Sequence, residues 1–309
     1  MGGGLTPYLA RRLWWALVTM LGISVINFVL IYAVPVDPAR MIVGIHAPES
    51  TVIAVRHALG LDRPIYVQYG IFLWNLVHLN LGYSYMDNRP VIGMIAQAFG
   101  NTARLAATAF LAEVLIGGTL GYVAALRRGR LVDRVLSFVG LVGMSIPNYW
   151  LGSVLLLVFA FLVPIFPLYG QGNLNLVLPA LTIGLTGAAW YMRVLRTSLV
   201  EIMASDHVRT ARAKGLSAWG VNLRHVLRNG LIPVVTLAGM DLAGMLSGIV
   251  IIETVFGWPG IGELAYQAVQ NLDIPVVMGT VLYTTAVIVL LNLAVDVLYA
   301  LLDPRVRYS

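Results

Sequence analysis

The sequence predicts an all-α membrane protein with six transmembrane helices, and three observations lead to that prediction. Hydrophobic residues make up 59% of the 309 residues and charged residues only 11%, whereas a typical soluble domain carries about 25% charge. The mean hydropathy is +0.84. Six apolar stretches are each long enough to supply the ~20 residues that a helix needs to cross a bilayer.

The six expected spans follow one another with polar segments between them. They cover, approximately, residues 13–34, 101–126, 135–164, 176–200, 231–256 and 276–302. Trp14 and Trp15 stand at the start of the first span, where interfacial aromatic residues are common. This span is too long for a signal-peptide core and lacks a small-residue cleavage site after it, so we expect it to be retained. Pro147 is expected to kink the third span.

Basic residues predict the orientation of the spans, because they concentrate on the cytoplasmic side of membrane proteins. Of the 20 arginine and lysine residues, 15 fall in the segments that six spans would place inside, including the run R-R-G-R at 127–130. Both termini are therefore expected inside. The net charge of +6 is accordingly read as a topology signal, and nucleic acid is not an expected partner.

The same orientation makes residues 35–100 an extracytoplasmic cap between the first two spans. Ser50 or Thr51 is expected to cap a short helix that runs to Leu59, and a second helix is expected from Ile65 to Leu79. The expected domains are therefore 1–34, the N-terminus and first span; 35–100, the cap; and 101–309, a core that holds the other five spans and a cytoplasmic loop at 201–230.

The longest polar interval between two spans, residues 205–233, carries the signals of two short helices joined by a turn. Val208, Ala211 and Arg212 share one face of the first helix. Gly215 can adopt the positive φ that ends a helix, and Ser217 can cap the next helix. The apolar side of this second helix is expected to consist of Val221, Leu223, Val226 and Leu227.

The order T-A-R-A-K-G-L, followed further along by L-R-N-G-L-I-P, resembles the coupling loop of permease subunits in bacterial ABC importers. Other stretches resemble the same family: V-P-V-D-P, A-L-G-L-D-R-P-I-Y-V-Q-Y, A-A-L-R-R-G-R-L-V-D-R, S-I-P-N-Y-W-L-G, E-T-V-F-G-W-P-G-I-G-E-L and the tail D-P-R-V-R. The resemblance covers nearly the whole chain. The sequence is thus similar to the B-type permease subunit of the dipeptide, oligopeptide and nickel importers.

This resemblance implies the type I permease fold of ABC importers and a division of labour between subunits. This chain and a paralogous permease would form the translocation pore, two cytoplasmic ATPases would bind ATP and Mg²⁺, and an extracytoplasmic solute-binding protein would deliver the ligand. The sequence has no G-x-x-x-x-G-K-[ST] motif, so no cofactor is expected in this chain. By motif match, the residues that couple to an ATPase are Thr210, Ala211, Arg212, Ala213, Lys214, Gly215, Arg224 and Arg228.

Acidic residues fall within the expected spans at Glu113, Asp241, Glu253 and Asp296, where such groups usually face a bundle interior or an aqueous path. Asp296 lies near the inner end of the sixth span, and we read it as an interfacial anchor. Asp241 either meets a cationic group of the ligand or forms a hydrogen bond at the contact with the partner permease. The role of Glu113 stays open. On the fifth span, Ile252 is expected on the same helical stripe as Asp241. The expected lining of the translocation path is Asp241, Met245, Gly248 and Glu253.

Two G-x-x-x-G pairs, Gly117 with Gly121 and Gly244 with Gly248, are expected to let helices approach closely. We read both pairs as packing positions, with a wide pore as a second role to be tested for Gly244 and Gly248.

Two other classes of protein fit the sequence less well. An intramembrane enzyme would need a motif such as H-E-x-x-H or G-x-S-x-G, but the five histidines have no metal-ligand spacing and there is no cysteine. Neither a catalytic residue nor a metal site is therefore expected. A secondary transporter would need internal inverted repeats, and we find no convincing repeat.

The expected protein is thus a multi-pass permease of the bacterial inner membrane, surrounded by lipid. Its expected ligand is a peptide, because peptides are the commonest ligand of subunits with this pattern. Nickel chelates, glutathione and haem are the alternatives within the same machinery.

Overall fold

The computed structural model describes residues 5–33, 37–44, 46–170 and 172–302, and within these ranges the regular structure is helical. Apart from the helices, the described residues contain one isolated antiparallel bridge, between Tyr83 and Pro90. The all-α prediction is therefore confirmed. The predicted tail motif at residues 303–307 lies outside the described residues.

Within the part of the chain that the structure describes, four helices are long and apolar enough to cross a membrane. They are α1 (Leu5–Ala33), α5 (Val91–Leu126), α8 (Asn173–Met203) and α15 (Ile274–Leu302). Two bent pairs of helices raise the number of candidate spans among the described residues to six if each pair counts as one span. The count of six and the orientation of the spans stay predictions.

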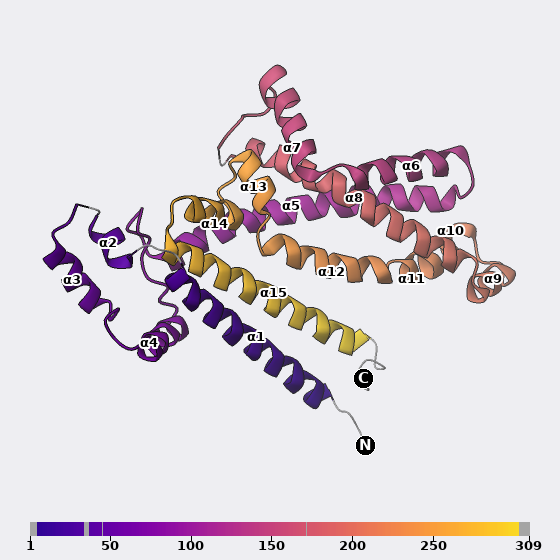
Figure 1. The fold of residues 1–309 in the computed structure, drawn as a ribbon. Coiled ribbons are helices and arrows are strands. Elements are labelled where there is room, and N and C mark those ends of the chain that lie inside the picture. Colours follow the sequence, from indigo (N-terminus) through magenta and orange to yellow (C-terminus); the bar gives the residue numbers. More distant parts are fainter. Residues whose placement is uncertain (1–4, 34–36, 45, 171, 303–309) are drawn as a thin grey trace. The chain divides into compact units, whose positions relative to one another are not determined.

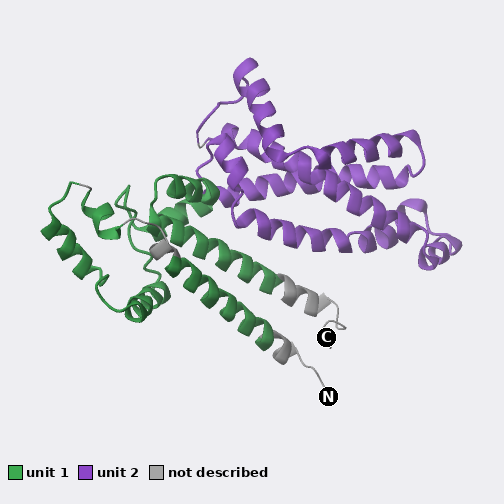
Figure 2. Cartoon of the chain, viewed as in Figure 1, with its two compact units in different colours: residues 1–100, 260–309 green, residues 101–259 purple. Residues whose placement is uncertain are grey.

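The contacts divide the chain into two compact units, which Figure 2 distinguishes by colour. Unit 1 consists of residues 1–100 and 260–309, and unit 2 of residues 101–259. The expected division into first span, cap and core stays a prediction.

Unit 1 is built on α1 and α15, which run side by side (Figure 1). A buried hydrogen bond joins them, because the Asn27 side chain donates to the backbone oxygen of Met278 at 3.2 Å. An apolar cluster packs the start of α5 against α15 and α14 (Ile261–Gln270), through residues such as Val91, Ile261 and Val276.

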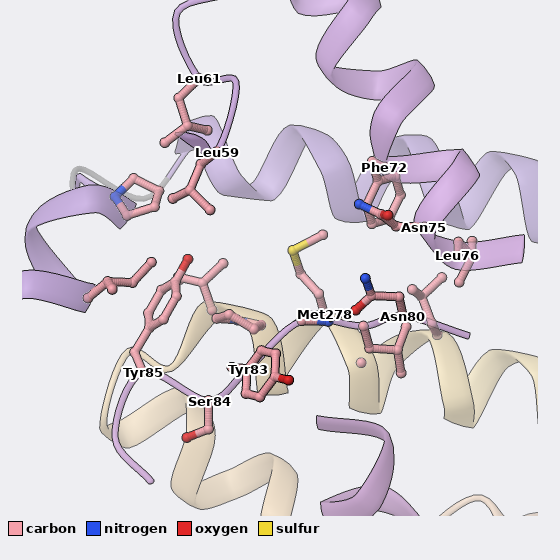
Figure 3. Close-up of a pocket in the computed structure, with 18 of the residues that line it drawn as sticks. Leu59, Leu61, Phe72, Asn75, Leu76, Asn80, Tyr83, Ser84, Tyr85 and Met278 are labelled. Atoms are coloured by element: carbon pink, nitrogen blue, oxygen red, sulfur yellow. Dashed lines mark hydrogen bonds between the residues drawn. The ribbon is translucent and has the colours of Figure 1, made fainter. Parts of the chain in front are cut away.

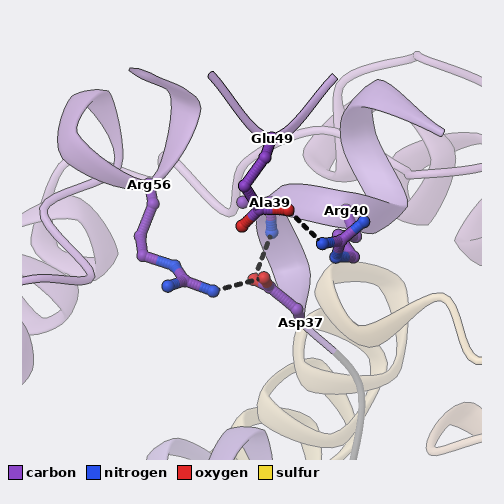
Figure 4. Close-up of polar contacts among 5 residues, drawn as sticks. All are labelled: Asp37, Ala39, Arg40, Glu49 and Arg56. Carbon is purple, nitrogen blue, oxygen red and sulfur yellow. Dashed lines mark hydrogen bonds and ion pairs between the residues drawn. The ribbon is translucent and has the colours of Figure 1, made fainter. Parts of the chain in front are cut away.

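The predicted cap contains α2 (Pro38–Val43), α3 (Glu49–Ala58) and α4 (Ile65–Val77). Asp37 begins α2 by accepting a hydrogen bond from the backbone nitrogen of Ala39, and it also binds Arg56 at 2.5 Å (Figure 4). The expected cap of α3 by Ser50 or Thr51 is wrong. Pro48 precedes that helix instead, and both predicted cap residues lie inside its first turn.

Unit 2 is organised on α8, which is flanked by α5, α6 (Leu131–Ser145) and α12 (Ile232–Leu246). The first glycine pair explains the contact of α5 with α8. A Cβ on Gly117 would lie 2.4 Å from the backbone oxygen of Ala188, and one on Gly121 would lie 2.7 Å from that of Met192. Packing through this pair is confirmed. Gly244, of the second pair, makes no such close contact, because nothing in the described chain lies within 4 Å of the position that a Cβ would occupy.

The third expected span is broken at Pro147 rather than kinked. Helix α6 stops at Ser145 and Ile146 is extended. Helix α7 (Asn148–Leu156) and the π-helical segment η1 (Leu157–Leu162), which continues it, then run at 95° to α6. The residue before a proline is pushed out of the helical region. A proline-induced kink would leave one bent helix, whereas here the chain leaves the helix and starts a new one.

The fifth expected span also consists of two helices, α12 and α13 (Val250–Phe256). Gly248 lies between them with φ +116°, a conformation that residues with a side chain rarely adopt. The expected continuous stripe from Asp241 to Ile252 is therefore wrong, because the helix does not run through it.

Candidate functional site

The first candidate site is the segment from Ser205 to Gly230, which we call the coupling segment. Its first helix, α9 (Asp206–Ala213), ends at Lys214, and Gly215 follows with φ +79°. Ser217 then caps α10 (Ala218–Val221) by accepting a hydrogen bond from the backbone nitrogen of Gly220 at 3.2 Å. The predicted helix, glycine turn and capped second helix are all confirmed.

One side of the coupling segment is anchored in unit 2. Val208 and Val221 are fully buried and pack in one apolar cluster with Leu195 and Leu199 of α8. The expected burial of Leu223 is wrong, since 39% of it is exposed. It falls in the π-helical segment η2 (Asn222–Leu227), whose wider turns change which residues face the core. A short helix, α11 (Arg228–Gly230), then leads into α12.

The other side of the coupling segment is open to solvent. Of the eight residues matched to the coupling motif, Ala211 is buried and the other seven are exposed: Thr210, Arg212, Ala213, Lys214, Gly215, Arg224 and Arg228. Two large apolar side chains, Leu216 and Trp219, are exposed on the same segment at 46% and 67%. Basic groups interleaved with apolar side chains are the composition of a protein-binding surface.

The second candidate site is a cavity of about 420 Å³ inside unit 2. Its wall includes Glu113 from α5 and Asp241, Met245 and Gly248 from α12 and the residues after it. The Tyr191 hydroxyl of α8 donates a hydrogen bond to the Asp241 carboxylate at 3.0 Å. Three of the four residues expected along the translocation path therefore border one cavity.

Glu253 lies elsewhere and is fully buried. It accepts a hydrogen bond from the Thr102 hydroxyl at 2.7 Å, which links α13 to α5. Near it, the Trp258 indole donates to the backbone oxygen of Asn101 at 3.0 Å. These contacts tie helices together and do not line the cavity.

The sequence did not indicate Gly187, which lines the cavity, or Tyr191, which binds Asp241. A Cβ on Gly187 would lie 1.8 Å from Glu113 Oε1, so the Glu113 side chain occupies the space that any larger residue at 187 would fill. No local pattern marks either residue, because the partners come from different helices. The sequence indicates only that Glu113 is an acidic residue within a predicted span. It does not indicate which residues surround that side chain.

Unit 1 holds a larger cavity, of about 670 Å³, between the predicted cap and the start of α15. Figure 3 shows Met278 reaching into it, with Tyr83, Tyr85 and Asn80 among the surrounding side chains. Burial, with a smaller contribution from the nearby Asp273 charge, raises the pKa of the Tyr85 phenol to about 12. The Tyr85 hydroxyl therefore stays neutral, and the cavity is predominantly apolar with a few uncharged polar groups.

Comparison with known proteins assigns the chain to a family. Residues 117–308 match the family model described as "Binding-protein-dependent transport system inner membrane component", and residues 5–106 match the model of its N-terminal part. Together with the apolar helical fold, these matches define a permease subunit of a binding-protein-dependent ABC importer, inserted in the inner membrane by several helices. The chain belongs to the family of binding-protein-dependent transport system inner membrane components.

Curated relatives match along the full chain. The glutathione transport system permease protein GsiC of Escherichia coli K12 is 38% identical over 303 residues, which is 98% of this chain and 99% of that protein. GsiC of Salmonella choleraesuis is equally similar. Members of this family are membrane components of the importer and do not themselves carry the catalytic activity.

Solved structures show the same fold. A structure of the MetNI methionine ABC transporter in inward-facing conformations matches with a TM-score of 0.56 and 19% identity, covering 69% of this chain and 97% of that one. An amino acid ABC transporter with histidines matches with a TM-score of 0.51 and 17% identity, covering 69% and 94%. The predicted ABC-importer permease fold is therefore confirmed.

Proposed function

We propose that this permease imports short peptides that include glutathione. The main support for this proposal is the 38% identity, over 98% of the chain, to proteins named as glutathione permeases. Glutathione is itself a tripeptide, so the peptide and glutathione alternatives describe one ligand class. Nickel chelates and haem fall outside this class, and the similarity gives them no support.

The proposed assembly pairs this chain with a paralogous permease, and the two form the pore. Two cytoplasmic ATPases bind ATP and Mg²⁺, and an extracytoplasmic solute-binding protein delivers the peptide. The open wall of the unit 2 cavity supports the pairing, because Gly244 has no packing partner within the described chain and borders that cavity.

The coupling segment is the proposed contact with an ATPase. Its buried side fixes it to α8 and its exposed side presents Arg212, Lys214, Arg224 and Arg228, which suit an acidic cleft. Gly215 sets the angle between α9 and α10 through its positive φ. Movement of an ATPase is thereby passed as a lever motion to α8 and α12, the helices that carry Tyr191 and Asp241. Asp241, Met245 and Gly248 are proposed along the translocation path, at the cavity, whereas the fully buried Glu253 is proposed to hold α13 against α5.

The test is reconstitution. The chain is tagged, expressed with its neighbouring genes and purified, and the partners are identified by mass spectrometry. The complex is then placed in liposomes with the solute-binding protein, and uptake of labelled glutathione, a dipeptide and a nickel chelate is measured with and without ATP. ATP-dependent uptake of the two peptides alone is expected. A complex that carries the nickel chelate and neither peptide would remove the proposal.

A further inference from the structure

We infer that Glu113 and Asp241 form a binding site for a primary ammonium group, such as the amino terminus of a peptide in transit. The inference rests on the proposed function, which places the unit 2 cavity on the translocation path. It goes further by assigning a role to Glu113 and a chemical determinant to the cavity.

Glu113 carries the inference. Its side chain is 2% exposed and borders the cavity. Its Oε2 atom is buried without a hydrogen-bond partner. Gly187 leaves the space in which this carboxyl lies. A buried polar atom normally has a partner, and leaving one unpaired costs about 1–3 kcal/mol. An acceptor of this kind, held at the wall of a cavity, fits a donor supplied by a ligand.

Asp241 provides the second carboxyl. It borders the same cavity from α12. The Tyr191 hydroxyl, itself on a buried residue, orients the Asp241 carboxylate through its hydrogen bond. The two carboxyls thus come from α5 and α12 and meet at a cavity that neither helix forms alone.

The other residues that line the unit 2 cavity indicate which kind of ligand it would bind. The described residues that line the cavity include no arginine, lysine or histidine, so the protein supplies no positive charge there. Trp190 adds an aromatic ring, to which an organic cation is attracted, and Met144 and Met240 add adaptable apolar surface. A hydrated metal ion would find few oxygen ligands beyond the two acids.

A primary ammonium meets these conditions. It has three N–H donors and a single positive charge, and charge-assisted hydrogen bonds to carboxylates are among the strong ones. Intramembrane acids usually pair with an opposite charge. The cavity volume of about 420 Å³ lies within the range of small-ligand sites, about 300–1,000 Å³. It is large enough for the first residue of a peptide.

The test uses n-butylammonium as the probe and the purified importer complex as the protein. Thermal unfolding is followed with n-butylammonium chloride, with n-butanol plus sodium chloride, and with magnesium chloride. The variants are Glu113→Gln and Asp241→Asn, and the control is Glu201→Gln, which changes an exposed acid on α8. A ligand that binds the native state raises the unfolding temperature.

We expect n-butylammonium alone to raise the unfolding temperature of the wild type and of Glu201→Gln, and each cavity variant to lose at least half of that rise. If Glu113→Gln does not fold, Asp241→Asn decides alone, because Asp241 is only half-buried and its amide isostere keeps the shape. No rise in the wild type, an equal rise in all variants or an equal rise with magnesium would each overturn the inference. Uptake of glutathione by the wild type is measured separately, so failure here leaves the proposed function standing.

Discussion

The Arg196 guanidinium holds the Asp133 carboxylate with two hydrogen bonds, of 2.6 and 2.9 Å, and so joins α8 to the first turn of α6. Asp133 is 2% exposed and also accepts a hydrogen bond from the backbone nitrogen of Gly129 at 2.8 Å. The turn between α5 and α6 is thereby fixed to α8, the helix that leads to the coupling segment.

Replacing Arg196 with alanine should destabilise the protein. Removing one partner of a buried ion pair costs about 3–5 kcal/mol, and because 29% of the Arg196 side chain is exposed, we expect the lower end, about 3 kcal/mol. Thermal unfolding of the purified protein measures this. Arg193→Ala, at an exposed position three residues earlier on the same helix, is the control and should have little effect. Equal losses in the two variants would contradict the assignment.

Two adjacent glycines on α5 should differ in how much their replacement by alanine lowers the stability of the protein. We expect Gly117→Ala to be destabilising and Gly118→Ala not to be. Gly117→Ala places a methyl group 2.4 Å from the backbone oxygen of Ala188, whereas nothing lies within 4 Å of the Cβ in Gly118→Ala. Overpacking costs about 1–3 kcal/mol. The stability of the two variants in a denaturant series distinguishes them. If Gly117→Ala is as stable as Gly118→Ala, the close contact of α5 with α8 is absent.

Gly215→Ala should uncouple ATP hydrolysis from transport. The residue has φ +79° with free space around it, so the methyl group costs about 1–2 kcal/mol of backbone strain without a steric clash. The turn relaxes and the angle between α9 and α10 changes. ATPase activity and peptide uptake by the reconstituted importer are measured together, and we expect uptake per ATP to fall several-fold.

Gly129→Ala is the matched control for that experiment. It has φ +78° and equally free space, in the turn between α5 and α6. The same strain is imposed outside the coupling segment, so uptake per ATP should stay close to the wild-type value. A similar fall in both variants would mean that backbone strain, and not the coupling angle, limits transport.

The attachment of the predicted cap to α15 should depend on Asp273. This buried carboxylate accepts hydrogen bonds from the Ser84 hydroxyl at 2.5 Å and the Tyr85 backbone nitrogen at 3.1 Å. Hydrogen bonds to a charged group are worth about 1.5–3 kcal/mol. Asp273→Ala should therefore speed hydrogen exchange of the Tyr85 amide by tenfold or more, which mass spectrometry of the exchanging peptides detects.

Arg40→Ala is the contrasting variant in the same cap. Arg40 pairs with Glu49 (Figure 4), but both side chains are largely exposed, and such pairs contribute about 0–1 kcal/mol. Its effect on exchange near Tyr85 should be small. A large effect would mean that the cap depends on its surface ion pairs.

Local chemistry explains what the sequence could predict of the candidate sites. The glycine turn at Gly215 and the cap by Ser217 need only neighbouring residues, and both have the predicted geometry. The four long apolar helices were predictable in the same way, because a long apolar run is a local signal. Leu223 was misplaced because a π-helical turn changes the residue that faces inward, and hydrophobic periodicity assumes a constant turn.

Contacts between distant segments explain what the sequence could not predict. Glu113, the α8 pair Gly187 and Tyr191, and Asp241 lie on three helices that are far apart along the chain, and only the packing of α5, α8 and α12 brings them together. The break at Gly248 depends on a backbone conformation that glycine permits but does not require. From the sequence alone, the acidic residues could be located but their neighbours could not, and the fifth span was expected to be one continuous helix.

Lys214 is the one lysine in the sequence, and it lies exposed at the end of α9. An amine-reactive dye would therefore modify side chains at a single place, and the absence of cysteine leaves thiol chemistry free for a second, introduced label. The protein thus carries a natural attachment point for fluorescence measurements at the surface where we propose an ATPase docks. Protection of this amine from acylation in the assembled importer would report that docking in an unmodified sequence.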